Sequence, residues 1–323
     1  MNWELDMVKD YFIWDAHGCF PLQPDADLSA LTMYKDSGVR FLSINVGMDH
    51  DPWTNIIKII ARYRRYIDEH SDRYTLIKST NDIRRANEDG KMAIALDLEG
   101  SDPLDGNLNM ISLYYDLGVR QMLLAYNKDN KASGGCFGNN EGLSDYGREI
   151  IREMNRVGML VDLSHMSDLA AKEAMEVSKS PAIFSHSNPR ALCDNDRNIT
   201  DELILACAKK GGVVGINGVG IFLGKDVDAK QLVNHIDYVA NLVGTEHVGI
   251  GLDYVVDQEE LVAYLKNNPD IYPPEKGFDL CKFIGPEEFP QITELLLKKG
   301  YSGKDISLIL GENFLRVAED VWK

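Results

Sequence analysis

The sequence predicts an α/β fold, a (β/α)8 TIM barrel with extra C-terminal helices. Eight short apolar runs alternate along the chain with stretches of helical periodicity, which is the pattern of a barrel built from strand–helix units. The chain has 323 residues, a suitable length for one barrel domain over 1–323. The alternative is a doubly wound sheet, but the composition shows no break that would divide the chain.

The expected strands are short apolar runs bounded by glycine, proline or polar residues, as in buried strands of a parallel sheet. They cover Phe12–Trp14, Val39–Ile44, Met92–Leu98, Gln121–Ala125, Met159–Leu163, Ala182–Phe184, Val213–Ile216 and Val248–Leu252. A short additional run, Tyr74–Ile77, precedes the third of them.

Apolar residues at helical spacing predict helices between and after these strands. They cover Thr54–His70, a short helix from Thr80, Leu108–Leu117, Ser167–Ser178, Asp228–Val243, Glu287–Lys299, Gly303–Leu310 and Asn313–Trp322. Two long connections, Asn127–Gly142 and Tyr254–Gly285, follow the fourth and eighth strands, and we expect them to fold over the mouth of the barrel as lids.

Composition narrows the classes of partner. The net charge of −17 disfavours nucleic acid, which needs a basic face. No apolar run is long enough to span a membrane, and the first residues lack a signal pattern, so we expect a cytoplasmic protein without a membrane partner. The five cysteines are irregularly spaced and form no CxxC pair, which argues against a disulfide framework or a zinc ribbon.

The stretch from Met159 to Arg197 carries the strongest functional signal. Two consecutive expected strands each end in Ser-His, at Ser164-His165 and Ser185-His186. In a parallel sheet both histidines lie at the carboxyl edge, where ligands bind. Two neutral imidazoles in that position suit a metal ion. The alternative is two ordinary histidines that end strands, but the repeat of the pattern favours a metal site.

The other expected strands also end in residues that can bind a metal ion or move a proton. These residues are His17, Cys19, Asn45, Glu99, Tyr126, Asn217 and Asp253. A purely structural explanation would bury these polar groups at the rim, which costs free energy unless they are paired. A barrel instead delivers them to one mouth, so we favour a metal site over that explanation.

The spacing predicts two metal ions. His17 and Cys19 can bind one ion, and His165 and His186 can bind the other. Glu99 lies on a strand between them and can bridge both ions through its two oxygens. Paired ions lower the pKa of a shared water towards neutrality and so provide a hydroxide.

The chain resembles the renal or membrane dipeptidase family, a zinc metallopeptidase branch of the amidohydrolase barrels. The matching segments are 15–19, 95–100, 161–165, 185–202, 247–253 and 300–317. The resemblance spans nearly the whole chain. Its most specific part runs from His165 to Arg197, where two histidines and an arginine fall at the family spacing.

The resemblance implies a binuclear zinc barrel that hydrolyses a dipeptide or dipeptide-like amide by a metal-bound hydroxide. It makes Glu99 the bridging ligand, with His17 on one zinc and the histidine pair on the other. It makes Asp253 the catalytic acid and base, and Arg197 the residue that binds the substrate carboxylate, a pairing that suits a guanidinium. The alternative for Arg197 is a surface ion pair or a helix cap near Thr200. The family also implies a homo-oligomer, a dimer or larger.

Two residues depart from the family pattern. Cys19 stands where the family has an aspartate; a thiolate binds zinc well, but a weak first site with one working metal, or a plain buried cysteine, are the alternatives. Tyr126 stands where the family has a histidine near the scissile carbonyl. Its hydroxyl can donate to an oxyanion and contact substrate, and the alternative is an aromatic ring packed over the barrel mouth.

Two other functions therefore stay open. The first is an amidohydrolase or lactamase of the same fold that acts on a non-dipeptide amide, with one metal ion. The second is a catalytically inactive barrel that binds a metabolite or a metal. A Cys19→Asp change helps to separate these functions. A gain in dipeptide turnover would mark Cys19 as a diverged ligand. Loss of metal and activity would mark Cys19 as a working ligand.

Overall fold

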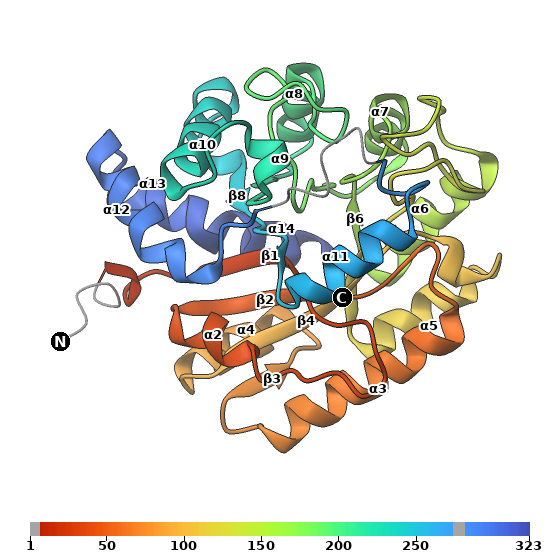
Figure 1. The fold of residues 1–323 in the computed structure, drawn as a ribbon, viewed down its shortest axis with the longest axis horizontal. Coiled ribbons are helices and arrows are strands. Elements are labelled where there is room, and N and C mark those ends of the chain that lie inside the picture. Colours follow the sequence, from red (N-terminus) through yellow and green to blue (C-terminus); the bar gives the residue numbers. More distant parts are fainter. Residues whose placement is uncertain (1–6, 274–281) are drawn as a thin grey trace.

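The computed structural model describes residues 7–273 and 282–323 and confirms the α/β barrel fold (Figure 1). The strands are β1 (Ile13–Cys19), β2 (Val39–Met48), β3 (Tyr74–Leu76), β4 (Met92–Glu99), β5 (Val119–Leu123), β6 (Leu160–Asp162), β7 (Val214–Ile216), β8 (Val248–Ile250) and β9 (Tyr254–Val255). The helices are α2 (Leu31–Asp36), α3 (Trp53–Glu69), α4 (Thr80–Glu88), α5 (Asn109–Leu117), α6 (Asp145–Val157), α7 (Asp168–Val177), α8 (Asp201–Lys209), α9 (Gly220–Leu223), α10 (Ala229–Val243), α11 (Gln258–Asn267), α12 (Phe289–Lys299), α13 (Gly303–Ser307) and α14 (Asn313–Val321).

Parallel backbone pairing can be followed around the barrel. The strands from β6 through β5, β4, β2 and β1 to β9 pair in that order, and β7 pairs with β8. Two isolated parallel bridges, Asp162 with Ile183 and Phe184 with Val214, join β6 to β7. On the other side, β9 follows β8 in the chain and pairs with β1. The expected strand at 182–184 is therefore present only as these two bridges.

Most expected elements are confirmed, with differences in the length of two strands and in the join between the last two helices. β1 and β2 extend beyond the apolar runs, so that His17 and Cys19 lie within β1 rather than after it. The closing pair of helices is joined by a π-helical turn, Leu308–Glu312, between α13 and α14. The additional run at 74–77 forms β3, which pairs with β4 outside the ring.

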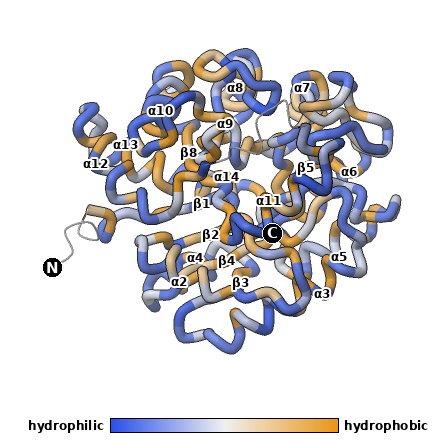
Figure 2. Tube along the Cα trace, viewed as in Figure 1, coloured by the Kyte–Doolittle hydropathy of each residue, from blue (hydrophilic) through white to orange (hydrophobic). Residues whose placement is uncertain are grey.

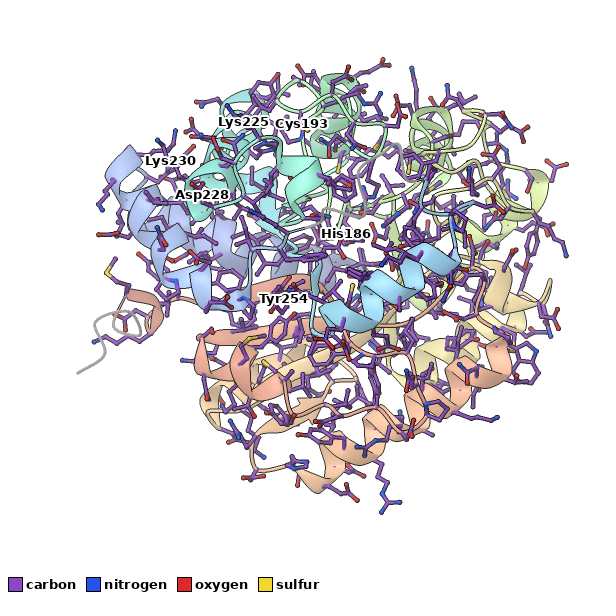
Figure 3. All side chains as sticks on the ribbon, in the orientation of Figure 1. His186, Cys193, Lys225, Asp228, Lys230 and Tyr254 are labelled. Atoms are coloured by element: carbon purple, nitrogen blue, oxygen red, sulfur yellow. The ribbon has the colours of Figure 1, made fainter. Side chains whose placement is uncertain are left out.

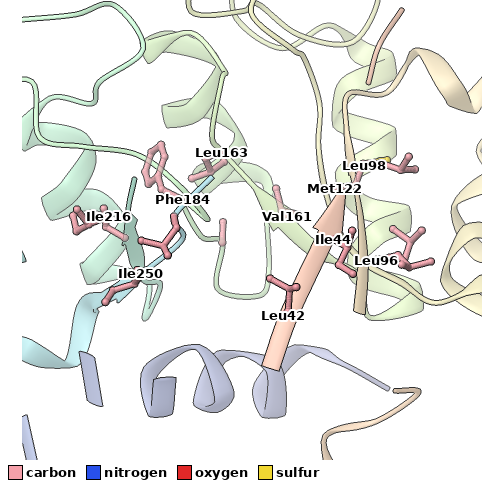
Figure 4. Close-up of a cluster of buried hydrophobic side chains, with 14 of the residues drawn as sticks. Leu42, Ile44, Leu96, Leu98, Met122, Val161, Leu163, Phe184, Ile216 and Ile250 are labelled. Carbon is pink, nitrogen blue, oxygen red and sulfur yellow. The ribbon is translucent and has the colours of Figure 1, made fainter. Parts of the chain in front are cut away.

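Alternate residues of the strands face two different cores. One set packs against the surrounding helices and includes Leu42, Ile44, Leu96, Leu98, Met122, Val161, Leu163, Phe184, Ile216 and Ile250 (Figure 4). Figure 2 shows hydrophobic segments gathered in the interior of the molecule and hydrophilic segments on the outer turns of the helices.

The second core closes the amino-terminal end of the barrel. Trp14 at the start of β1 stacks on Phe41 with ring centroids 3.5 Å apart, and Phe314 of α14 lies 6.0 Å from Trp14. These rings belong to one cluster of buried residues that includes further side chains of α14. The C-terminal helix thus occupies the end of the barrel where the strands begin, and ligands can approach only the carboxyl ends of the strands.

None of the helices within 7–273 and 282–323 is long and apolar enough to cross a lipid bilayer. The described cysteines, Cys19, Cys136, Cys193 and Cys207, are free thiols, and Cys281 lies outside the described residues. The expectation that the chain lacks a disulfide framework agrees with these four.

A buried histidine on α10 makes the stability of the fold depend on pH. His235 is fully buried, with its Nε2 atom 3.0 Å from the carbonyl oxygen of Leu223. Burial, opposed by that hydrogen bond, lowers the pKa of His235 to about 4. The unfolded chain, with a histidine pKa of about 6.5, binds a proton between pH 6.5 and 4 that the native chain does not, so stability falls as the pH falls through this window.

We therefore expect the unfolding free energy of His235→Gln to fall less than that of the native protein as the pH is lowered from about 6.5 to 4. The difference between the two proteins should change across this window by up to about 3 kcal/mol, the free-energy equivalent of the pKa shift. Urea denaturation at a series of pH values measures it. Parallel pH profiles for the native protein and the variant would show that His235 titrates alike in both states.

Candidate metal centre

Three histidines converge on one carboxylate oxygen at the carboxyl ends of the strands. The Oε1 atom of Glu99 lies 3.1 Å from His165 Nε2, 3.3 Å from His186 Nε2 and 3.6 Å from His17 Nε2. The Nε2 atoms of His165 and His186 are 3.0 Å apart. The amide of Asn45 donates to the other oxygen of Glu99 at 3.1 Å. All five side chains are buried, and His186 lies near the middle of the molecule in Figure 3.

A second group of possible ligands shares His17. The Sγ atom of Cys19 lies 3.5 Å from His17 Nε2 and donates to Asp253 Oδ1 at 3.3 Å. The same Asp253 oxygen lies 3.7 Å from His17 Nε2, and Asn217 donates to its other oxygen at 2.9 Å. The atoms of His17, Cys19 and Asp253 are close enough together to hold one metal ion, as are those of His17, Glu99 and His186.

Local backbone conformation delivers these side chains to the site. The pairing of β1 with β2 is irregular between Asp15 and Gly18, where His17 lies, and such bulges redirect side chains near active sites. His165 and Asp253 adopt φ angles of 65° and 55°, in the left-handed region that residues with a Cβ rarely occupy. Strain of this kind costs about 1–3 kcal/mol per residue and concentrates at functional sites.

Hydrogen bonds to the far nitrogens fix two of the histidine rings. His165 Nδ1 lies 2.7 Å from the side-chain oxygen of Asn127. His186 Nδ1 lies 2.6 Å from the hydroxyl of Ser185, which in turn contacts the buried carboxylate of Asp162. An acceptor at Nδ1 keeps the proton there and leaves Nε2 free to bind a metal, which is the usual arrangement around metal-binding histidines.

Asp97 forms an ion pair with the far nitrogen of His17. Its Oδ1 atom lies 3.2 Å from His17 Nδ1, and its Oδ2 atom accepts a hydrogen bond from Ser43 at 2.6 Å. Sequence reasoning missed Asp97, although the signal was present. Asp97 and Glu99 are two apart on β4 and therefore face the same side of the strand.

We expect Asp97→Asn to weaken metal binding by about 10–100-fold while leaving the fold intact, because the partner that orients His17 loses its charge. A competition titration with a chromophoric zinc chelator measures the affinity. Ser43→Ala removes only the outer hydrogen bond to Asp97 and serves as the milder control. Equal affinities for Asp97→Asn and the native protein would show that Asp97 does not support a metal ligand.

The electrostatics of the cluster favour a bound cation. Burial, opposed by His17 and reinforced by Asp253 and Asp97, raises the pKa of Glu99 to about 8. Burial, together with the charges of Arg197 and His17, lowers the pKa of His165 well below its usual range, and His186 is affected in the same way. The imidazoles of His165 and His186 are thus neutral, as metal ligands must be. The pKa of His17 is instead raised well above its usual range, because the effect of burial is outweighed by the charges of Asp97 and Glu99. The Glu99 carboxylate needs positive charge beside it to ionise at neutral pH.

The donor set itself fits zinc. Imidazole nitrogen, thiolate sulfur and carboxylate oxygen are the ligands that zinc takes in proteins. Burial and the neighbouring Asp253 raise the pKa of Cys19 far above that of an ordinary thiol, so Cys19 is a protonated thiol unless a bound metal displaces the proton.

A cavity of about 240 Å³ opens on this cluster. Its floor includes Cys19, Asn45, Glu99, His165 and Asp253, and its walls are mostly apolar. A small set of polar groups at the base of an apolar cavity is the usual form of a small-molecule site.

Tyr126 lines this cavity but points away from the cluster. Its ring packs on that of His165 with centroids 4.4 Å apart. Its hydroxyl lies 2.7 Å from the hydroxyl of Tyr272, and burial raises the pKa of Tyr126 well above its usual range, so the group is a neutral donor. Its expected role in catalysis and substrate binding stays a prediction.

Arg197 is buried directly behind the cluster. Its guanidinium donates to the carbonyl oxygen of His186 at 2.8 Å and to the hydroxyl of Ser187 at 2.9 Å, and it lies over the ring of Phe222. Its Nε atom has no hydrogen-bond partner among the described residues. Arg197 is not among the described residues that line the cavity, whereas Phe222 is. Its expected role as carboxylate ligand stays a prediction.

The two expected lids also lie near the site. The backbone N–H of Cys136, in the loop 127–142, donates to the carbonyl oxygen of His165 at 2.8 Å, so this loop packs on the cluster. The segment 254–285 contains β9 and α11, and α11 contributes residues to the cavity wall. The part of this segment at 274–281, with Pro274, lies outside the described residues.

Comparison with known proteins agrees with this geometry. Residues 48–268 match the family model described as membrane dipeptidase, peptidase family M19. The chain is 30% identical to Dipeptidase 3 of Rattus norvegicus and 27% identical to Dipeptidase tcpJ of Claviceps purpurea, over 98% of its own length in both cases. It spans 66% of the rat protein and 75% of the fungal one.

Solved structures show the same fold. An amidohydrolase from Pseudomonas aeruginosa superimposes with a TM-score of 0.89 at 29% identity, over 99% of both chains. A metallopeptidase from Rhodobacter sphaeroides, liganded with a phosphinate mimic of the dipeptide L-Ala-D-Ala, superimposes with a TM-score of 0.79 at 18% identity, over 97% of this chain and all of the other. The family resemblance expected from the sequence motifs is confirmed: the chain belongs to the membrane dipeptidase family, peptidase family M19, and is a hydrolase of that family.

Proposed function

We propose that the protein hydrolyses a dipeptide or dipeptide-like amide with two zinc ions. His17, Cys19, Glu99, His165 and His186 would hold the ions. The observation that supports this most is the convergence of three buried imidazoles on one oxygen of Glu99, beside a second group of donors that shares His17. When bound, zinc supplies water activation at neutral pH and polarises a substrate carbonyl.

Asp253 is the residue placed to move the proton. Its carboxylate lines the cavity, and Asn217 holds one of its oxygens at 2.9 Å. The other oxygen lies beside His17 and accepts a hydrogen bond from the Cys19 thiol. With that thiol proton displaced by a bound zinc ion, this oxygen would accept a proton from the attacking water and return it to the leaving amine. Glu99 and the buried rings of His165 and His186 fix the position of the reacting groups relative to Asp253.

One observation favours a second candidate, hydrolysis of an amide that lacks a free carboxylate. Arg197, the expected carboxylate ligand, is not among the described residues that line the cavity, and it already donates to two oxygens of the protein. A lactam or other non-dipeptide amide would leave those contacts unchanged. The inactive metabolite- or metal-binding barrel is the remaining alternative, and cytoplasmic location and a dimeric state stay predictions from the sequence.

Zinc-loaded protein assayed on a panel of dipeptides and lactams tests the proposal. We expect dipeptide turnover that Asp253→Asn abolishes and that Arg197→Met reduces mainly through KM. Lactam turnover that is insensitive to Arg197→Met would favour the second candidate. If the protein binds zinc but turns over none of these amides, the inactive metabolite- or metal-binding barrel becomes the preferred function.

A further inference from the structure

The wall of the cavity opposite the metal centre is formed largely by one helix. Leu261, Tyr264 and Leu265 of α11 all line the cavity, and their spacing of three and four residues places them on one face of the helix. Val262, the next residue after Leu261, is 43% exposed and is not among the described residues that line the cavity. In Figure 1, α11 crosses in front of the strands of the barrel, consistent with its place over the open cavity.

This apolar wall is a packed unit distinct from the barrel core. Leu265 and Tyr272 are buried with Val219 and Phe222 in a cluster of their own, against which further apolar residues pack. The rings of Tyr264 and Tyr272 meet edge to face with centroids 5.8 Å apart. Because these side chains pack on one another, the wall keeps its shape without a ligand.

The charged groups of the cavity all have one sign. Besides Glu99 and Asp253, the charged side chains among the described lining residues are those of Asp51, Asp257 and Glu260, and no lysine or arginine is among them. Hydrogen bonds hold these carboxylates in place: the backbone N–H of Met48 donates to Asp51, and Gln23 donates to Glu260. An acidic substrate side chain close to Asp51, Asp257 or Glu260 would meet electrostatic repulsion in a partly enclosed space.

We propose that α11 and Tyr272 form a specificity pocket that selects amide substrates with a bulky apolar side chain beside the scissile bond and rejects acidic side chains. This inference rests on the proposed hydrolysis. The scissile amide must lie at the metal centre, so a flanking side chain extends across the cavity towards Leu261, Tyr264 and Leu265. The volume of about 240 Å³ suits a dipeptide rather than a longer peptide.

The test compares kcat/KM for Leu-Gly, Gly-Leu, Ala-Gly, Gly-Ala, Glu-Gly and Gly-Glu in zinc-loaded protein. We expect leucine at one of the two positions to be preferred over alanine by at least about tenfold, since each methylene in an apolar pocket contributes roughly that much. Leu261→Ala should reduce this preference several-fold. Val262→Ala, the neighbouring change on the exposed face of the same helix, should leave it unchanged.

A second variant tests the charge of the pocket without changing the size of any side chain. Glu260→Gln retains the size of the side chain and removes one charge, and we expect it to raise the relative kcat/KM of the glutamate dipeptides without changing the leucine-to-alanine ratio. Equal leucine-to-alanine ratios in the native protein and Leu261→Ala would overturn the pocket. Native turnover of glutamate dipeptides as fast as leucine dipeptides would overturn the rejection of acids.

The outcomes separate this inference from the proposed function. If no dipeptide is hydrolysed, the proposed function fails, and the pocket is then tested by binding. In that case isothermal titration of the zinc-loaded protein with L-leucinamide and L-alaninamide should still favour leucinamide in the native protein and not in Leu261→Ala. If dipeptides are hydrolysed without preference for leucine, hydrolysis stands and the pocket does not.

Discussion

Replacing Glu99 by glutamine lowers the turnover of the zinc-supplied protein by at least about a thousandfold, because one change removes the carboxylate shared by all three histidines. Glutamine keeps the size of the side chain but binds zinc poorly. We expect the zinc content to fall below that of the native protein. Steady-state kinetics and elemental analysis on the same preparation measure both effects.

The melting temperature of the metal-free Glu99→Gln variant provides an independent test of the role of Glu99. Burial raises the pKa of Glu99 to about 8, so the metal-free fold binds a proton at neutral pH that the unfolded chain does not bind. This proton uptake costs stability, and the neutral amide, which avoids it, should raise the melting temperature of the metal-free protein. The increase in melting temperature that zinc gives the native protein should be smaller in the variant. Glu69→Gln, on the exposed face of α3, is the matched control. A variant with native zinc content and native turnover would contradict the role of Glu99.

Asp253→Asn separates proton transfer from metal binding. If Asp253 moves the proton, kcat falls by roughly 10²–10⁴-fold, the usual contribution of a general acid–base group, while two zinc ions stay bound. The amide of asparagine can still face Asn217, so the cavity keeps its shape. The measurement is kcat together with zinc content on the same preparation.

Asp253 also belongs to the second group of possible ligands, with His17 and Cys19. If the variant loses one zinc ion along with its turnover, Asp253 is a metal ligand rather than the proton carrier. Cys19→Ser provides the comparison, since it changes a ligand in the same group without changing the carboxylate. Native kcat in Asp253→Asn would exclude both roles.

The sequence predicted the strands well because buried parallel strands are short apolar runs with clear boundaries. It placed the polar residues at the ends of those runs, and this was enough to bring His17, Glu99, His165, His186 and Asp253 together at one mouth. It ended β1 too early, because Asp15 and His17 interrupt the apolar pattern although both lie within the strand. Inside the barrel these polar groups have partners from distant parts of the chain, such as the backbone N–H of Leu252 for Asp15, and a local sequence pattern does not reveal them.

Other features depended on tertiary packing. Helix α6 was not predicted, although Ser144 caps its start and Gly158 its end, because charged residues fill its exposed face. The inward face of α11 lies in a segment that we expected to be a loop over the mouth. The positions of Arg197 over the ring of Phe222 and of the Tyr126 hydroxyl beside Tyr272 depend on residues far apart in the chain, so no local pattern predicts them.

Zinc stoichiometry tests the central claim most directly. Protein purified without chelator, and metal-free protein titrated with zinc, should both reach two ions per chain by elemental analysis, and Cys19→Ser should fall to one or bind the second ion weakly. One ion that is unaffected by Cys19→Ser would contradict the binuclear site. No bound zinc at any concentration of free metal would contradict the metal centre altogether.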